Sequence, residues 1–202
     1  MAKLILLRHG QSTWNLENRF TGWVDVPLTP QGEEEARQAG LRIREFPLDL
    51  AYCSVLKRAI DTLTIALEAA CQPGLPTVFD QALNERMYGD LQGLNKADTM
   101  AKFGEEQVKL WRRSYDVAPP GGESLKDTAA RTLPYFESKI MDSVKEGKNV
   151  IISAHGNSLR AIGMVLDGLD EAGVLKLEIP NGIPIVYEIG QDGKVVSKHI
   201  LN

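Results

Sequence analysis

The sequence contains only two cysteines and three histidines among its 202 residues, and it lacks the patterns that identify several common classes of enzyme. The spacing of Cys53 and Cys71 is typical of neither a metal site nor a set of disulfides, so we expect two buried, inert thiols and no bound metal. There is no Gly-x-Ser-x-Gly nucleophile elbow, no glycine-rich dinucleotide loop and no Walker-type phosphate loop. These absences remove the commonest alternative chemistries.

Long apolar runs are absent as well. No stretch approaches the roughly 20 apolar residues that a membrane-spanning helix requires. The amino terminus lacks the basic, apolar and cleavage-site pattern of a secretory signal. We therefore expect a cytoplasmic protein with no membrane partner. The net charge of −4 argues against nucleic acid as the main partner, but it is compatible with a local cationic pocket.

The length of 202 residues, of which 43% are hydrophobic and 25% charged, suits one globular domain spanning 1–202. Strand-like apolar runs alternate with helical patterns along most of the chain, at 4–7, 48–53, 77–83, 150–154, 184–189 and 194–200. We predict an α/β fold, a three-layer sandwich whose mostly parallel central sheet is flanked by helices. The last two runs, joined by a turn at 191–193, are predicted to form an antiparallel hairpin.

Helical patterns fill the intervals between these runs. Thr29 and Pro30 are typical of a helix start, and the helix is predicted to run to about Arg44. Further helices are predicted at 56–67, at 125–144 with a bend at Pro134, and at 158–166. Between residues 84 and 122 the pattern changes to short polar and helical pieces. We interpret this segment as an inserted cap.

Two of the predicted strands end in a histidine followed by a glycine. The first strand runs into Arg8, His9 and Gly10, and the run at 150–154 continues into His155 and Gly156. Because ligands bind at the carboxyl edge of a parallel sheet, we expect both histidines at one site. Gly10 is expected to let the backbone turn close to the ligand.

Cationic side chains are predicted to gather around this edge. Arg8 ends the first strand, Arg58 follows the second, and the cap carries Lys96 and the pair Arg112 and Arg113. Each of these side chains, taken alone, is more often solvated or paired with a carboxylate than functional. Together they suit phosphate, because the guanidinium fork matches phosphate oxygens and an imidazole nitrogen can attack phosphorus. The residues therefore favour phosphoryl transfer.

The sequence also contains the motifs RHGQS, NRFTGWVDVPLT, LNERMYGDLQGLNK, WRRSYD and AHGNSLRA. Together these motifs resemble those of the cofactor-dependent phosphoglycerate mutases, a branch of the histidine phosphatase superfamily. RHG alone is typical of the whole superfamily. The loop around Thr21, Gly22 and Trp23, the NERMYG segment and the paired arginines narrow the resemblance to the mutase branch.

The resemblance implies that His9 is the nucleophile that carries the phosphoryl group, with Arg8, Arg58 and His155 around that group. Glu85 would be the general acid and base, which requires a carboxyl shielded enough to hold a proton part of the time. The residues implied to hold the substrate carboxylate and phosphates are Ser12, Asn15, Thr21, Gly22, Tyr88, Lys96, Arg112, Arg113 and Asn157.

The resemblance further implies an enzyme that interconverts 3-phosphoglycerate and 2-phosphoglycerate, is primed by 2,3-bisphosphoglycerate and uses no metal. The cap, at 85–120, is the expected lid, because closure excludes water and strengthens the electrostatics. The expected partners are small-molecule phosphoglycerates. Assembly into a homo-oligomer is left open by the sequence.

Two other functions remain open. In a phosphomonoesterase of the same superfamily, water would take the phosphoryl group from His9. This alternative is favoured by the direct passage from Pro120 to Glu123, where many mutases carry an additional stretch. A catalytically inactive phosphate-binding protein would be expected to lack one of the residues named for catalysis, yet all of them are present.

Overall fold

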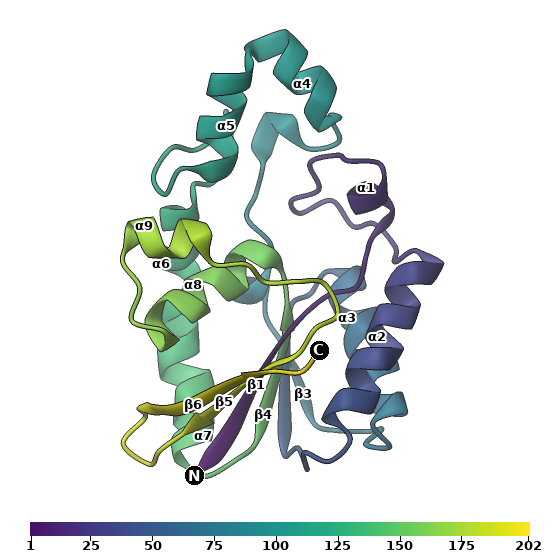
Figure 1. The fold of residues 1–202 in the computed structure, drawn as a ribbon, viewed down its shortest axis with the longest axis vertical. Helices are drawn as coiled ribbons and strands as arrows, with labels where there is room; N and C mark the ends of the chain where they lie inside the picture. Colours follow the sequence, from purple (N-terminus) through teal and green to yellow (C-terminus); the bar gives the residue numbers. More distant parts are fainter.

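The computed structural model describes all 202 residues, and a six-stranded sheet lies at its centre (Figure 1). The strands are β1 (Ala2–Arg8), β2 (Leu50–Cys53), β3 (Thr77–Phe79), β4 (Val150–Ala154), β5 (Ile185–Ile189) and β6 (Val195–Ile200), in the order β3-β2-β4-β1-β5-β6. The first four strands are parallel, whereas β5 pairs antiparallel with both β1 and β6. The predicted mostly parallel sheet and its terminal hairpin are confirmed.

Helices cover both faces of the sheet. One face packs against α2 (Pro30–Ile43) and α3 (Lys57–Ala69), and the other against α6 (Leu125–Tyr135), α7 (Met141–Lys145) and α8 (Gly156–Leu166). Along β1, Leu4 and Leu6 belong to the core on the α6–α8 side, whereas Ile5 and Leu7 belong to the core on the α2–α3 side. A strand buried on both faces reads as a continuous apolar run, which is the pattern seen in the sequence. The predicted three-layer architecture is confirmed.

Local chemistry explains where α2 begins and where α6 ends. The Thr29 side chain accepts a hydrogen bond from the Gly32 backbone N–H at 3.1 Å, and Pro30 occupies the first turn of α2. The long helix predicted at 125–144 is interrupted just after Pro134. There a π-helical segment, η3 (Phe136–Ile140), joins α6 to α7, since proline removes one backbone donor from the helical ladder.

The cap stands over the carboxyl edge of the sheet (Figure 1). It contains α4 (Lys96–Phe103) and α5 (Glu105–Arg113), and the short 3₁₀ turns η1 (Gln81–Leu83) and η2 (Gly89–Leu91) lead into it. Its small core joins Leu91, Val108 and Trp111 to Phe20, which comes from the first loop. That loop also contains a short helix, α1 (Thr13–Leu16). The cap is thus built from two separate parts of the sequence.

The expectation of two buried thiols is confirmed for Cys53 and wrong for Cys71. Cys53 is buried on β2, and burial raises its pKa to about 12. Cys71, also expected to be buried, is exposed, because it lies beyond the end of α3 in the left-handed backbone region with φ 59°. The short helix α9 (Glu171–Lys176) was not predicted. No helix has both the length and the apolar character to cross a membrane.

Candidate active site

The two strand-histidine-glycine junctions lie side by side. Strands β1 and β4 are neighbours in the sheet, with Arg8 opposite Ala154, and the His9 N–H donates to the Ala154 carbonyl at 3.1 Å. The rings of His9 and His155 consequently lie 5.0 Å apart, centroid to centroid. The sheet register therefore brings both histidines to one edge.

The hydrogen bonds of His9 determine which ring nitrogen is free to react. Its Nδ1 lies 2.7 Å from the Gly10 carbonyl oxygen, which can only accept a hydrogen bond, so the proton is placed on Nδ1. Its Nε2 lies 3.4 Å from Nε of Arg58, which donates. Burial, followed by the charges of Arg58 and Arg8, holds the pKa of His9 well below its usual value. His9 is therefore a neutral imidazole with a lone pair on Nε2, the form required for nucleophilic attack.

His155 is buried behind the surface of the site. Its Nε2 lies 2.8 Å from the Ser54 hydroxyl, which donates to the Asn84 side-chain carbonyl at 2.8 Å. Its Nδ1 is buried and has no partner within the protein. Burial, together with the charge of Arg58, holds the pKa of His155 well below its usual value. Because the Ser54 hydroxyl donates to Asn84, Nε2 of His155 carries the ring proton, and the orphaned Nδ1 holds a lone pair on a ring directly beside His9. A phosphate oxygen would pair with Nδ1 only with a proton between them, carried by the phosphate or taken up by the ring.

Two arginines are fixed beside His9 by backbone carbonyls. The Arg58 guanidinium is buried and donates to the Gly22 and Val24 carbonyls of the first loop at 2.7 and 3.0 Å, and burial lowers its pKa to about 10. Arg8 donates to the Ile179 carbonyl at 2.8 Å, but its buried Nε has no acceptor. Neither arginine forms an ion pair within the protein. Their charge is thus left for an anion.

Glu85 is the single carboxylate in this cationic environment. Its Oε1 accepts hydrogen bonds from the backbone N–H groups of Arg86 at 2.8 Å and Asn157 at 3.0 Å. Burial alone would raise the pKa of Glu85, but the Arg86 N–H and the charges of Arg8 and Arg58 outweigh it and lower the pKa. The expectation that this carboxyl holds a proton part of the time is therefore wrong for the ligand-free site. A phosphate dianion bound opposite Glu85 would move the pKa upward.

A cavity at this edge brings most of the predicted site residues together. Its lining includes seven arginine or lysine side chains and only one carboxylate. The lining residues are Arg8, His9, Asn15, Arg19, Phe20, Thr21, Gly22, Arg58, Glu85, Tyr88, Lys96, Arg112, Arg113, Gly156, Asn157 and Arg160. Such an excess of cations around one cavity favours a ligand with several negative charges.

Two predicted residues do not line the cavity. His155 lies behind it, as described above. Ser12 is fully buried and caps α1: its hydroxyl lies 3.3 Å from the Asn15 N–H that donates to it, and the Asn15 side chain accepts from the Ser12 N–H at 3.1 Å. Ser12 therefore positions Asn15, which does line the cavity, and makes no contact of its own with the cavity.

Two further cations line the cavity without having been predicted. Arg160 donates to the Leu177 carbonyl at 2.8 Å and to the Asn157 side-chain carbonyl at 3.3 Å. It lies three residues after Asn157 on α8, so helical spacing could have placed both on one face. Arg19 donates to the Gly93 carbonyl at 2.8 Å. Its neighbours Thr21 and Gly22 in the NRFTGW motif were the available signal.

The expected reason for Gly10 is also wrong. Its φ is not in the left-handed region, and the atoms nearest to an added Cβ belong to α2. A Cβ at Gly10 would lie 2.1 Å from the Gly32 carbonyl oxygen, and a Cβ at Gly32 would lie 2.1 Å from the Gln11 carbonyl oxygen. The two glycines let the end of β1 approach the first turn of α2. Gly10 thus fixes where His9 stands, and the close approach is made to α2.

Comparison with known proteins identifies the family. The family model of the histidine phosphatase superfamily (branch 1) matches residues 4–201. The chain belongs to the histidine phosphatase superfamily. Among solved structures of this fold, a mycobacterial glucosyl-3-phosphoglycerate phosphatase shares 29% identity at a TM-score of 0.81, covering 98% of this chain and 96% of that one. YhfR from Bacillus stearothermophilus shares 27% identity at a TM-score of 0.84, covering 96% and 94%.

Curated relatives with higher identity carry the mutase name. A 2,3-bisphosphoglycerate-dependent phosphoglycerate mutase 2 from Gloeobacter violaceus is 58% identical over 193 residues, which cover 96% of this chain and 88% of the relative. A 2,3-bisphosphoglycerate-dependent phosphoglycerate mutase from Brucella canis is 56% identical over 201 residues, with 98% of both chains covered. The latter match leaves little room for an additional stretch. The short passage from Pro120 to Glu123 therefore does not separate this chain from proteins named mutases.

Proposed function

We propose that this protein is a 2,3-bisphosphoglycerate-dependent phosphoglycerate mutase that interconverts 3-phosphoglycerate and 2-phosphoglycerate through a phosphohistidine at His9. The main support is the identity of 54 to 58% over nearly the full chain with proteins of that name. The geometry agrees with the chemistry, because a neutral His9 and one carboxylate, Glu85, face a cavity whose other charged lining residues are arginines and lysine.

The site offers a nucleophile and a means of holding the transferred group. His9 Nε2 attacks the phosphorus of a bound phosphate ester, a P–N bond forms, and the P–O bond of the ester breaks. Arg8 and Arg58 stabilise the charge of the transferring group, since their N–H groups are already oriented by backbone carbonyls. His155 lies behind this phosphoryl pocket, with its ring 5.0 Å from that of His9.

Glu85 is the general acid and base of the transfer. As the ester bond breaks, a protonated Glu85 gives its proton to the leaving oxygen, and in the reverse direction the carboxylate takes the proton from the attacking hydroxyl. The lowered pKa of the ligand-free carboxyl suits the second task. The phosphate charges brought by the substrate raise the pKa and suit the first. The same group therefore serves both directions of a reversible transfer.

The remaining cavity residues hold the rest of the substrate. Bisphosphoglycerate supplies the phosphoryl group that primes His9. Its two phosphates and its carboxylate match the cavity because cationic side chains extend from the sheet edge to the cap. We assign the carboxylate and the second phosphate to Asn15, Thr21, Gly22, Tyr88, Lys96, Arg112, Arg113 and Asn157. Arg19 and Arg160 join this set, and Ser12 acts through Asn15.

A phosphomonoesterase is the second candidate, because the solved structures reported above include a phosphatase with the same fold. One assay separates the two functions. The protein is given 3-phosphoglycerate with a trace of 2,3-bisphosphoglycerate, and both 2-phosphoglycerate and free phosphate are measured. A mutase forms 2-phosphoglycerate in large excess over phosphate, whereas stoichiometric phosphate release without isomerisation refutes the proposal.

We also propose that the reaction needs no metal ion, since fixed arginine and lysine side chains occupy the places where charge develops. Turnover measured after exhaustive treatment with a chelator should equal that of the untreated protein. Activity that is lost with the chelator and restored by a divalent cation would show that a metal takes part.

A further inference from the structure

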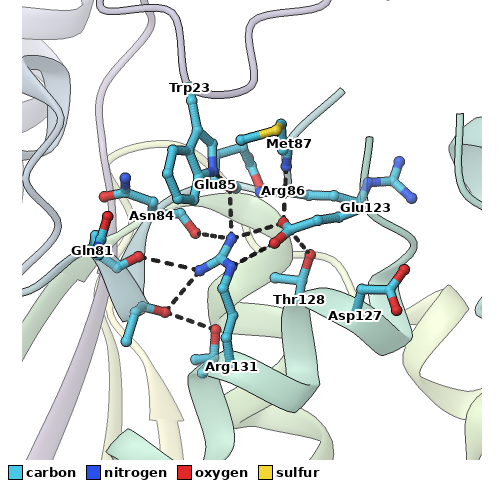
Figure 2. A network of polar contacts seen from close by, with 12 residues as sticks. Trp23, Gln81, Asn84, Glu85, Arg86, Met87, Glu123, Asp127, Thr128 and Arg131 are labelled. Atoms are coloured by element: carbon cyan, nitrogen blue, oxygen red, sulfur yellow. Dashed lines mark hydrogen bonds and ion pairs between the residues drawn. The ribbon is translucent and has the colours of Figure 1, made fainter. Parts of the chain in front are cut away.

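The segment that carries Glu85 has no regular secondary structure of its own. Residues 84–88 run between the sheet and the cap, after η1 and before η2. A general acid needs a fixed position, because an error of about 1 Å in geometry costs about 10²-fold in rate. One side chain of α6, Arg131, reaches the start of this segment (Figure 2).

Arg131 holds the carbonyl oxygens at the start of the segment and in η1 just before it. Its Nη2 donates to the carbonyl oxygens of Glu85 at 2.8 Å and Asn84 at 3.1 Å. Its Nη1 donates to those of Ala82 at 2.9 Å and Gln81 at 3.3 Å. A planar guanidinium with five N–H donors in a fixed fork can hold such a row of carbonyls, and an ammonium group cannot.

Glu123 completes the arrangement and ties it to the cap. Its Oε1 accepts from Nε of Arg131 at 2.8 Å, and its Oε2 accepts from the Met87 N–H at 3.0 Å. The Glu123 N–H donates to the Met87 carbonyl at 2.7 Å. Residues 87 and 123 lie where the chain enters and leaves the cap. The Glu123–Arg131 pair therefore connects both of these points, and the segment that carries Glu85, to α6.

The peptide group of Glu85 is held from a second direction as well. The indole N–H of Trp23 donates to the Glu85 carbonyl at 2.5 Å, and the Arg131 guanidinium lies 5.4 Å from the centre of the Trp23 ring. The ion pair is largely shielded, with Arg131 and Glu123 side chains 21% and 20% exposed. Charge-assisted hydrogen bonds shielded in this way are stronger and more rigid than surface pairs.

We propose that the Glu123–Arg131 pair is the positioning device for Glu85, setting the distance between its carboxylate and the leaving oxygen without touching the substrate. The inference rests on the proposed function only in taking Glu85 as the proton donor. It assigns a function to two residues outside the cavity. Their loss should impair proton delivery and spare the attack by His9.

The dependence on leaving group distinguishes positioning from general structural support. The alkoxide that leaves 2,3-bisphosphoglycerate is strongly basic and needs a proton, whereas p-nitrophenolate leaves without one. Initial phosphorylation of His9 is measured with 2,3-bisphosphoglycerate and with p-nitrophenyl phosphate, by acid-labile phosphate on the protein and by the burst of p-nitrophenolate. The variants are Arg131→Met and Glu123→Gln, and Arg131→Lys serves as the conservative replacement.

We expect Arg131→Met to lower the rate with 2,3-bisphosphoglycerate about 10²-fold, and the rate with p-nitrophenyl phosphate by about tenfold or less. Glu123→Gln, which keeps a side-chain oxygen for Arg131, should fall between wild type and Arg131→Met, and Arg131→Lys should recover only part of the loss. The matched control is Lys3→Met, which breaks the half-buried Lys3–Glu188 pair at 3.0 Å on β1 and β5 and should leave both rates unchanged.

Equal losses with the two esters would overturn the inference, and so would unchanged rates. If Arg131→Met fails to fold, as judged by thermal melting, the comparison is made with Glu123→Gln and Arg131→Lys, and the same selectivity is required. If wild type hydrolyses phosphoglycerate without isomerising it, the proposed mutase function fails on its own. The leaving-group comparison is then made for hydrolysis of the same two esters.

Discussion

Replacing Gly10 by alanine tests the argument that the end of β1 is placed by α2. The added Cβ would lie 2.1 Å from the Gly32 carbonyl oxygen, 2.7 Å from its carbon and 2.8 Å from its Cα. All three are backbone atoms in the first turn of α2, which cannot rotate away as a side chain could. Ordinary contact begins at 3.4 Å, so strand and helix must separate by roughly 1.3 Å.

The separation cannot be confined to Gly10. Its N–H donates to the Thr62 hydroxyl at 3.0 Å, and the His9 carbonyl accepts from the Asn181 side chain at 2.7 Å. Overpacking of this kind typically costs about 1–3 kcal/mol. For a chain of this size each kcal/mol corresponds to a melting temperature lower by about 2–4 °C, so we expect a fall of about 2–12 °C. Because His9 is the neighbouring residue, a shift of this size should also lower turnover about 10²-fold.

The measurement pairs thermal melting with the mutase assay. Gly190→Ala is the control, because its Cβ would meet only a side-chain oxygen of Asp192 within 3.4 Å, at 2.7 Å in the terminal hairpin. That variant should retain wild-type turnover. A Gly10→Ala protein with unchanged melting temperature and turnover would refute the packing argument. A variant with normal stability but weakened phosphate binding would restore the original interpretation, in which Gly10 makes room for the ligand.

Three further predictions follow from the site. His9→Gln should abolish both turnover and acid-labile phosphorylation. Acid-labile phosphate found on this variant would show that another residue is the nucleophile. Arg112→Ala, which removes a cap cation, should increase the ratio of free phosphate to 2-phosphoglycerate, and an unchanged ratio would contradict its assignment. The lowered pKa values of His9 and His155 mean that the unfolded chain binds more protons, so the free energy of unfolding should fall as pH drops below about 6.5. Melting curves from pH 7.5 downward should show this fall.

The parts of the fold that the sequence predicts well are those specified by local pattern. The apolar runs at 4–7 and 150–154 became neighbouring parallel strands, and Thr29 with Pro30 began a helix as expected. Both depend on short-range physics, namely burial on two faces and the capping of free N–H groups. The shared carboxyl edge of parallel strands then determines which polar residues meet.

The parts that the sequence does not predict depend on contacts between distant segments. Arg131 lies in an ordinary amphipathic helix pattern, and nothing local indicates that its guanidinium meets carbonyls some 50 residues earlier in the chain. The role of Gly10 likewise depends on Gly32. The pKa of Glu85 is lowered first by the N–H of its neighbour Arg86, but then by the charges of the distant residues Arg8 and Arg58. Such contacts require the tertiary structure, since no periodicity in the sequence reports them.

The choice between mutase and phosphatase depends on the cap more than on the histidine. In the proposed mechanism, attack by His9 is the same in both reactions, and so is stabilisation of the transferring group by Arg8 and Arg58. A mutase must also retain a bisphosphorylated intermediate until it has turned round, which requires charge opposite the sheet edge and exclusion of water. Lys96, Arg112 and Arg113 provide that charge from α4 and α5. Glu123 bonds to Met87 and so joins the two chain segments that lead into and out of the cap, beside Glu85. Retention of the intermediate and proton transfer therefore depend on the same part of the structure.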